Sequence, residues 1–190
     1  SKNNLIPIIN SISELKRINK SSLKFGLHID TGMNRLGINY NEIPKHVFDN
    51  KNIKIIISHL ASADEKNNQY NYLQKNIFLK EIKKFNHDNI IFSLANSNGS
   101  ILSESFLFDM IRPGIGLYGG NNNNKLLKKS IKPVVRLSGK IIQIKTINKN
   151  EFIGYNQTYK TRKKLKIAIV GIGYADGLPR KLSNIGNVYY

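Results

Sequence analysis

The chain has 190 residues, of which 40% are hydrophobic, and its 30 lysine and arginine residues against 12 aspartate and glutamate residues give a formal net charge of +18. This composition supports one ordinary or two small packed domains, and the absence of cysteine excludes disulfides, thiolate metal sites and a cysteine nucleophile. Because no apolar run is long enough to span a bilayer and the first residues do not have the pattern of a signal peptide, we expect a soluble, cytoplasmic protein.

Short apolar strands and longer helical patterns alternate through the first two-thirds of the chain. Helical spacing covers Ile8 to Ile18, with Pro7 in the first turn. The elements predicted next, in chain order, are a strand at 23–29, a short helix at 42–49, a strand at 53–58, a helix from 63 to about 85 with apolar positions Tyr72, Ile77, Phe78, Leu79 and Ile82, a strand at 90–94, a helix at 97–106 and a strand at 110–112. Apolar strands that alternate with helices are typical of a parallel sheet covered by helices.

The pattern changes after Gly119-Gly120. Residues 121–129 form a polar connector, and Pro133 marks the entry to a different kind of segment. Four further strands are predicted with no helices between them, at 134–145, 153–155, 165–172 and 188–190. We therefore expect two domains, residues 1–125 and residues 126–190, of which the second is β-rich.

The high positive charge raises the question of nucleic-acid binding. Only six of the 30 basic residues are arginine, and the lysines are scattered along the whole chain among asparagine and isoleucine. A nucleic-acid-binding protein usually gathers its basic residues on one face, often with aromatic residues between them. We interpret the lysines as solvated surface residues and expect no nucleic-acid partner, although a lysine-rich nucleic-acid-binding protein remains an alternative on charge alone.

Polar sequences follow four of the predicted strands, at 30–35, 58–64, 95–97 and 112–115. In a β/α barrel the carboxyl ends of the strands form one rim, so we expect these groups to converge on one site. Together they supply two guanidinium groups, an imidazole, a carboxylate, a hydroxyl and backbone amides. This set suits a ligand that carries a phosphate and a carboxylate.

Each of these residues also has an ordinary structural interpretation. Arg35 and Arg112 could be ion-pair partners, and His59 could be a buried histidine of the core. Ser97 could cap a helix, and Gly114 could serve a tight turn. Tyr174, in the sequence Gly-Tyr-Ala-Asp-Gly, could be a half-buried strand residue. Each signal is weak alone, and it is their joint placement that favours a site.

In their order and spacing these segments resemble the alanine racemase family. The matching segments span nearly the whole chain and are 28–37, 58–65, 95–97, 112–119 and 173–177 with Arg180. The resemblance implies an α/β protein, in which a partial (β/α)8 TIM barrel that binds pyridoxal 5'-phosphate is followed by the start of a β-rich C-terminal domain. It also implies a metal-independent isomerase that interconverts L-alanine and D-alanine by two-base proton transfer, and so supplies D-alanine for peptidoglycan.

The resemblance assigns roles residue by residue. Tyr174 corresponds to one of the two catalytic bases, Arg35 to the arginine that helps to hold the substrate carboxylate, and Asp64 to an acidic residue of the entry channel. The cofactor-binding positions are His59 against the pyridine ring, Arg112 at the pyridine nitrogen, and Ser97, Gly114 and Ile115 at the phosphate. The family further implies a homodimer in which Tyr174 reaches the site of the partner subunit.

Two features depart from the family pattern. The family's cofactor lysine lies near the amino terminus on the first barrel strand, and no lysine here matches it, so we expect an internal fragment that is inactive alone. His28 stands where many members carry a lysine that becomes carbamylated and orients the neighbouring arginine. Because histidine cannot form a carbamate, we expect Arg35 to be held differently, for example by a bound anion. A racemase of the same fold that acts on serine or on a broader set of amino acids remains an alternative.

Overall fold

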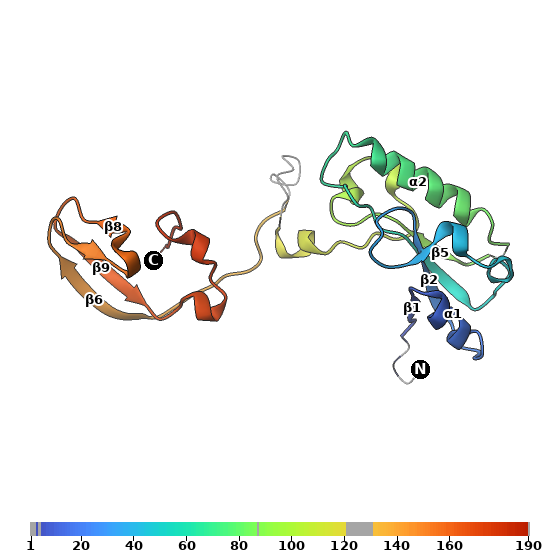
Figure 1. Cartoon of the computed structure of the whole chain (residues 1–190), viewed down its shortest axis with the longest axis horizontal. Helices are drawn as coiled ribbons and strands as arrows, with labels where there is room; N and C mark the ends of the chain where they lie inside the picture. The colour runs from blue at the N-terminus through green and yellow to red at the C-terminus, as the bar shows by residue number, and fades with distance from the viewer. Residues whose placement is uncertain (1–2, 4, 87, 121–130, 190) are drawn as a thin grey trace. The chain divides into compact units, whose positions relative to one another are not determined.

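A computed structural model of the chain describes residues 3, 5–86, 88–120 and 131–189 (Figure 1). It divides into two compact units, residues 1–135 and residues 136–190. The predicted connector at 121–129 and the predicted domain boundary at 125/126 lie outside the described residues.

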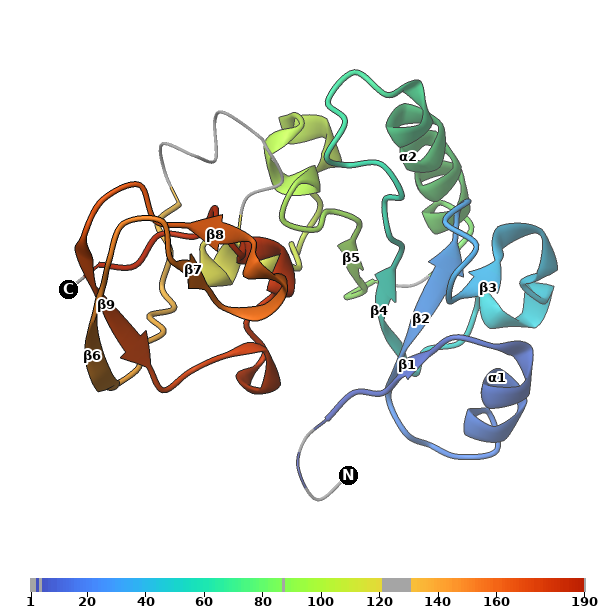
Figure 2. The same ribbon diagram turned by 60° about the vertical axis from the view of Figure 1, so that its left-hand side comes forward.

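A parallel sheet forms the centre of the first unit. Strands β1 (Ile8–Ile9), β2 (Phe25–Asp30), β4 (Ile53–Ile57) and β5 (Ile91–Ser93) lie side by side in that order, and β3 (Ile38–Asn39) pairs with the end of β2 (Figure 2). All four strand pairings are parallel. Helix α1 (Ile12–Ile18) connects β1 to β2, and α2 (Gln69–Ile82) lies between β4 and β5 in the chain. The predicted α/β architecture of a partial barrel is thus confirmed.

The core of this unit lies between the sheet and its two helices. Every residue of β2 is buried, and apolar side chains of the strands form one cluster with Leu15 of α1 and Phe78 of α2. Helix α1 begins after Ser11, whose Oγ accepts a hydrogen bond from the Glu14 backbone N–H at 3.2 Å. Packing on this core brings the carboxyl ends of β2, β4 and β5 to one edge of the sheet.

The helix predicted from Ile8 to Ile18 is wrong at its start. Ile8 and Ile9 pair with Gly26 and Leu27 of β2, and the helix begins only after the Ser11 cap. A strand of two residues leaves no periodicity of its own in the sequence. Ile8 and Ile9 also fit the helical spacing of the residues that follow, so the pattern predicted one continuous helix.

Other predicted elements are shorter or different in the structure. The α-helix predicted at 42–49 is replaced by two 3₁₀ turns, Tyr40–Glu42 and Lys45–Val47, on either side of Pro44, whose ring disfavours the α conformation in the residue before it. The helix predicted at 97–106 is likewise two 3₁₀ turns, Gly99–Ile101 and Glu104–Phe106. The strand predicted at 110–112 is reduced to a single bridge between Asn96 and Arg112.

The second unit is β-rich, as predicted. Strand β6 (Ile141–Ile147) pairs antiparallel with β9 (Leu165–Val170), and β7 (Phe152–Ile153) pairs with β8 (Tyr159–Lys160). The expectation of strands alone is wrong in detail, because 3₁₀ turns form at Tyr155–Gln157, Tyr174–Asp176 and Arg180–Leu182. No strand forms at residues 188 and 189. Among the residues described in both units, no helix is long and apolar enough to cross a membrane.

Candidate functional site

Arg112 is fixed by hydrogen bonds to the ends of β4 and β5. Its Nη1 donates to the Ser93 carbonyl at 2.9 Å and to Ser93 Oγ at 2.5 Å, and its Nη2 donates to the Ser58 carbonyl at 2.5 Å. These acceptors are neutral, and within the described ranges no acidic side chain pairs with this guanidinium. Burial lowers the pKa of Arg112, so its charge is held where water does not fully solvate it. These contacts hold the guanidinium in place.

His59 lies against this guanidinium. Nη2 of Arg112 is 3.4 Å from Nδ1 of His59. Because a guanidinium carries only donors, Nδ1 is the acceptor, and the proton of the neutral imidazole lies on Nε2. Burial, then the charge of Arg112, then that of Arg35 lower the pKa of His59. His59 is thus kept neutral at pH values near 7.

Asn96 approaches the other nitrogen of the same ring. Its Oδ1 accepts the backbone N–H of Gly99 at 2.8 Å, which turns its Nδ2 toward Nε2 of His59 at 3.5 Å. Both ring nitrogens of His59 therefore face donors: the neutral ring with its proton on Nε2 accepts from Arg112 and not from Asn96, whereas the doubly protonated ring could accept from neither. This arrangement disfavours the imidazolium form in the same direction as burial does.

Backbone amides converge on Ser97. Its Oγ accepts the N–H of Gly114 at 2.9 Å and the N–H of Gly116 at 3.1 Å, so its own proton is free to be donated outward. A Cβ added at Gly114 would meet no atom within 4 Å, so a ligand can approach the backbone there. The neighbouring Asn98 Oδ1 is buried without a hydrogen-bond partner among the described residues. The Ser97 hydroxyl is a donor that suits an oxygen of a phosphate, whereas the Gly114 and Gly116 amides already donate to Ser97 Oγ.

His28 and Arg35 lie beside this group. Nδ1 of His28 is 2.8 Å from Oδ1 of Asn10, and the Asn10 amide is oriented by its Nδ2, which donates to the Ile8 carbonyl at 3.0 Å. His28 therefore donates its Nδ1 proton to Asn10. Burial, then the charge of Arg112 lower the pKa of His28 to about 4, and Arg35 adds to this effect. Arg35 itself is exposed.

The structure brings some of the predicted residues together and not others. His59, Arg112, Ser97 and Gly114 are gathered at the carboxyl ends of β4 and β5, and Ile115 opens an exposed 3₁₀ turn, Ile115–Tyr118. Asp64 is exposed in the loop before α2. Tyr174 belongs to the second unit, where its exposed ring lies 5.8 Å from the Arg180 guanidinium. In the described part of the chain, no group of three histidine or acidic side chains could hold a metal ion.

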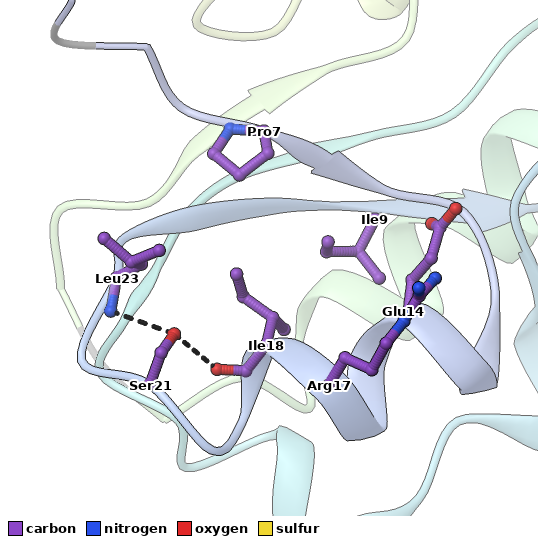
Figure 3. Close-up of a pocket in the computed structure, with 7 residues that line it drawn as sticks. All are labelled: Pro7, Ile9, Glu14, Arg17, Ile18, Ser21 and Leu23. Carbon is purple, nitrogen blue, oxygen red and sulfur yellow. Dashed lines mark hydrogen bonds between the residues drawn. The ribbon is translucent and has the colours of Figure 1, made fainter. Parts of the chain in front are cut away.

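Two pockets lie away from these residues. One, of about 360 Å³, lies between β1 and α1 and is lined by Pro7, Ile9, Glu14, Arg17, Ile18, Ser21 and Leu23 (Figure 3). The other, of about 660 Å³, is in the second unit and is lined by Lys149, Asn150, Thr158, Tyr159, Lys160, Thr161 and Arg162. Neither contains a residue that the sequence predicts for the site.

Several residues of the site were missed by sequence reasoning. Ser93 and Gly116 carry no signal of their own, because one acts at the end of a strand and the other through its backbone. Asn96 lies inside a noted segment, directly before Ser97, but its approach to His59 depends on a contact 37 residues away in the chain.

The parallel β/α architecture defines a partial β/α-barrel protein, in which a half-buried arginine–histidine pair and the amides gathered at Ser97 lie at the strand ends. The profile described as "Alanine racemase, N-terminal domain" matches residues 1–122, and that described as "Alanine racemase, C-terminal domain" matches residues 134–190. The chain belongs to the alanine racemase family.

Individual relatives agree with this assignment. The alanine racemase of Rickettsia bellii is 37% identical over 198 residues, which cover 98% of this chain and 48% of the relative. Among solved structures, that of alanine racemase from E. faecalis has a TM-score of 0.82 and 28% identity, with 97% of this chain and 54% of that chain covered. The Bartonella henselae alanine racemase, solved with covalently bound pyridoxal phosphate, has a TM-score of 0.75 and 31% identity, with 95% and 53% covered. The chain spans about half the length of the curated relatives that it matches.

Proposed function

We propose that this chain is part of a pyridoxal-phosphate-dependent alanine racemase that interconverts L-alanine and D-alanine. The family membership supports this proposal, and so does one observation in particular: the half-buried guanidinium of Arg112 is held by neutral acceptors and contacts His59 at 3.4 Å. This pair is suited to a flat heteroaromatic ring with an acceptor nitrogen, because a guanidinium donates hydrogen bonds and cannot accept a proton.

The residues present fit pyridoxal phosphate. Ser97, through its hydroxyl, would hold the phosphate together with Gly114 and Ile115, Arg112 would donate to the pyridine nitrogen, and His59 would lie against the ring. When bound, the cofactor supplies an electron sink for the pair of electrons left when the α-proton of the amino acid is removed. Arg112 would leave the ring nitrogen without a proton, and so weaken this sink and disfavour side reactions.

The remaining residues would hold the substrate and move its proton. Arg35 would bind the substrate carboxylate, for which a guanidinium has the matching geometry. Tyr174 would act as one of two bases on opposite faces of the α-carbon, since inversion requires proton removal on one face and proton return on the other. Asp64 would line the route by which substrate enters. Neutral His59 would accept a hydrogen bond at Nδ1 from Arg112 and donate one from Nε2 to the tyrosine that a partner subunit supplies.

We extend the proposal to the protein's oligomeric state and its role in the cell. Tyr174 would complete the site of a partner subunit in a homodimer. The enzyme would work in the cytoplasm, and its D-alanine would enter peptidoglycan synthesis.

The test uses the full-length protein with pyridoxal phosphate and L-alanine in deuterated water. Optical rotation and deuterium at Cα are followed together, with L-serine as a parallel substrate. We expect rotation to be lost while deuterium enters at Cα, faster for alanine than for serine. Protein that carries bound cofactor and shows neither change would refute the racemase. A faster reaction with serine would retain the chemistry and change the substrate.

A further inference from the structure

The buried face of α2 is unusually polar. Its four buried residues, Asn71, Gln74, Phe78 and Glu81, recur at helical spacing, and three of them are polar. Buried polar groups cost free energy unless they are hydrogen-bonded, so a helix that only packs on a core would present apolar residues here. Tyr72, one of the apolar positions that the sequence pattern indicated, is 39% exposed instead. The polar side chains on this face must therefore have hydrogen-bond partners outside the apolar core.

The Gln74 amide forms hydrogen bonds to the backbone of the segment that carries His59. The side chain is fully buried, and its Oε1 accepts the Ala61 backbone N–H at 2.9 Å, while its Nε2 donates to the His59 carbonyl at 2.9 Å. The carbonyl of one residue and the N–H of the residue two positions later are the pair that a neighbouring strand would engage. Gln74 thus extends the backbone restraint beyond β4, which ends at Ile57, and across His59.

The same amide also reaches the end of β2. Nε2 of Gln74 donates to Thr31 Oγ1 at 3.3 Å, and Thr31 Oγ1 lies 2.8 Å from Ser58 Oγ. Thr31, Ser58 and Gln74 are all buried. Ser58 in turn accepts from Arg112 through its carbonyl. Gln74 therefore bonds directly to His59 and Thr31. Through Thr31 it is also linked to Ser58, whose carbonyl accepts from Arg112.

Asn71 and Glu81 on the same helix face have different partners. Asn71 donates to the carbonyls of Ser62 and Glu65, farther along the loop. Glu81 pairs with Lys84 at 2.7 Å, more than one helical turn from Gln74. Of these three buried polar residues, Gln74 is the one bonded to His59.

We propose that Gln74 is a positioning residue, which sets the place of the His59 imidazole against Arg112 by holding the backbone of His59 and Ala61. The proposal rests on the proposed function for its effect on turnover, but the geometry of His59 can be measured without it. Loss of these two hydrogen bonds would let residues 59–61 shift and would admit water to the His59 ring. Misplacement by about 1 Å can cost about 100-fold in rate in such sites.

The experiment compares Gln74→Met with the unchanged protein and with Glu81→Gln, all at full length and loaded with cofactor. Gln74→Met keeps the length of the side chain and removes its hydrogen bonds, whereas Glu81→Gln changes a buried polar residue of the same face away from the site. Three quantities are measured: the thermal unfolding midpoint, kcat and KM for alanine, and the titration of His59 by NMR of histidine labelled at Cε1, assigned with His59→Gln.

We expect Gln74→Met to lower kcat about 10- to 100-fold with KM changed less than about threefold. The His59 titration midpoint should rise by about half a unit or more, because water then solvates the charged form. Glu81→Gln should lower the unfolding midpoint and leave the titration unchanged. The proposal is overturned if His59 titrates as in the unchanged protein, or if Glu81→Gln moves it equally.

Gln74→Leu is the second variant if Gln74→Met does not fold. It removes both hydrogen bonds without adding a charge, so the same direction of change is expected. Failure of both to fold would assign Gln74 to stability alone and overturn the proposal. If the unchanged protein shows no racemisation, the proposed function fails, while the His59 titration still decides the role of Gln74.

Discussion

Nη2 of Arg112 lies 3.4 Å from Nδ1 of His59, although the two residues are 53 positions apart in the chain. The contact follows from the parallel pairing of β4 with β5, since His59 comes just after one strand and Arg112 is anchored to the end of the other. Because the guanidinium can only donate, the contact assigns the histidine proton to Nε2. It also places a positive charge beside the ring, which with burial lowers the pKa of His59.

Arg112→Lys should destabilise the first unit and the site together. An ammonium group cannot reach both the Ser93 and Ser58 acceptors in the planar geometry of the guanidinium. Loss of charge-assisted hydrogen bonds should lower the free energy of unfolding by about 1–3 kcal/mol, measured by urea denaturation. Affinity for pyridoxal phosphate, measured by absorbance titration of the full-length protein, should also fall. Arg17→Lys, an exposed change on α1, is the matched control, and an equal loss there would contradict the assignment.

Asn96→Asp should raise the pKa of His59. The carboxylate would keep the acceptor for the Gly99 N–H and replace the donor that faces Nε2 with a negatively charged acceptor. An opposite charge at this distance favours the imidazolium form. The NMR titration of His59 should therefore move to higher pH, whereas Asn41→Asp, at an exposed position, should leave it unchanged. A titration that moves to lower pH in Asn96→Asp would contradict the contact.

His28 should make the stability of the fold depend on pH. Its pKa is lowered from 6.5 to about 4, chiefly by burial, so between these values the unfolded chain binds a proton that the folded chain does not. The free energy of unfolding is therefore unaffected by His28 above pH 6.5 and decreases as the pH falls from 6.5 toward 4. Urea midpoints measured across this range should fall less steeply for His28→Gln than for the unchanged protein. His46→Gln, an exposed change, should keep the original slope, and equal slopes in all three proteins would refute the prediction.

Tyr174→Phe tests the proposed second base. Racemisation should fall by about 100-fold or more in both directions, because each direction needs both bases and the equilibrium constant of a racemisation is one. Solvent deuterium should still enter at Cα of the enantiomer whose proton faces the remaining base. Cofactor binding should be unchanged. Tyr159→Phe, in β8, serves as the control, and near-original rates in Tyr174→Phe would remove the role assigned to this tyrosine.

Some features of this protein could be predicted from its sequence because they are local. The runs at Ile53–Ile57 and Leu165–Val170 are apolar and β-branched enough to predict strands without reference to their neighbours. The segments around His59, Ser97 and Arg112 each follow a predicted strand, and parallel strands end at one edge of a sheet. The alternation of elements and the grouping of these three residues therefore follow from sequence pattern alone.

Only the tertiary structure decided the features that depend on distant partners. Ile8 and Ile9 form a strand because Gly26 and Leu27 are there to pair with them. Gln74 can be buried because its amide hydrogen-bonds to Thr31, 43 residues away, and to the His59 carbonyl. A buried amide is stable only where such partners satisfy it, and their positions are set by the packing of the whole sheet rather than by any local period. The sequence by itself therefore determined which residues stand at the strand ends, whereas the packed fold decided which of their atoms meet.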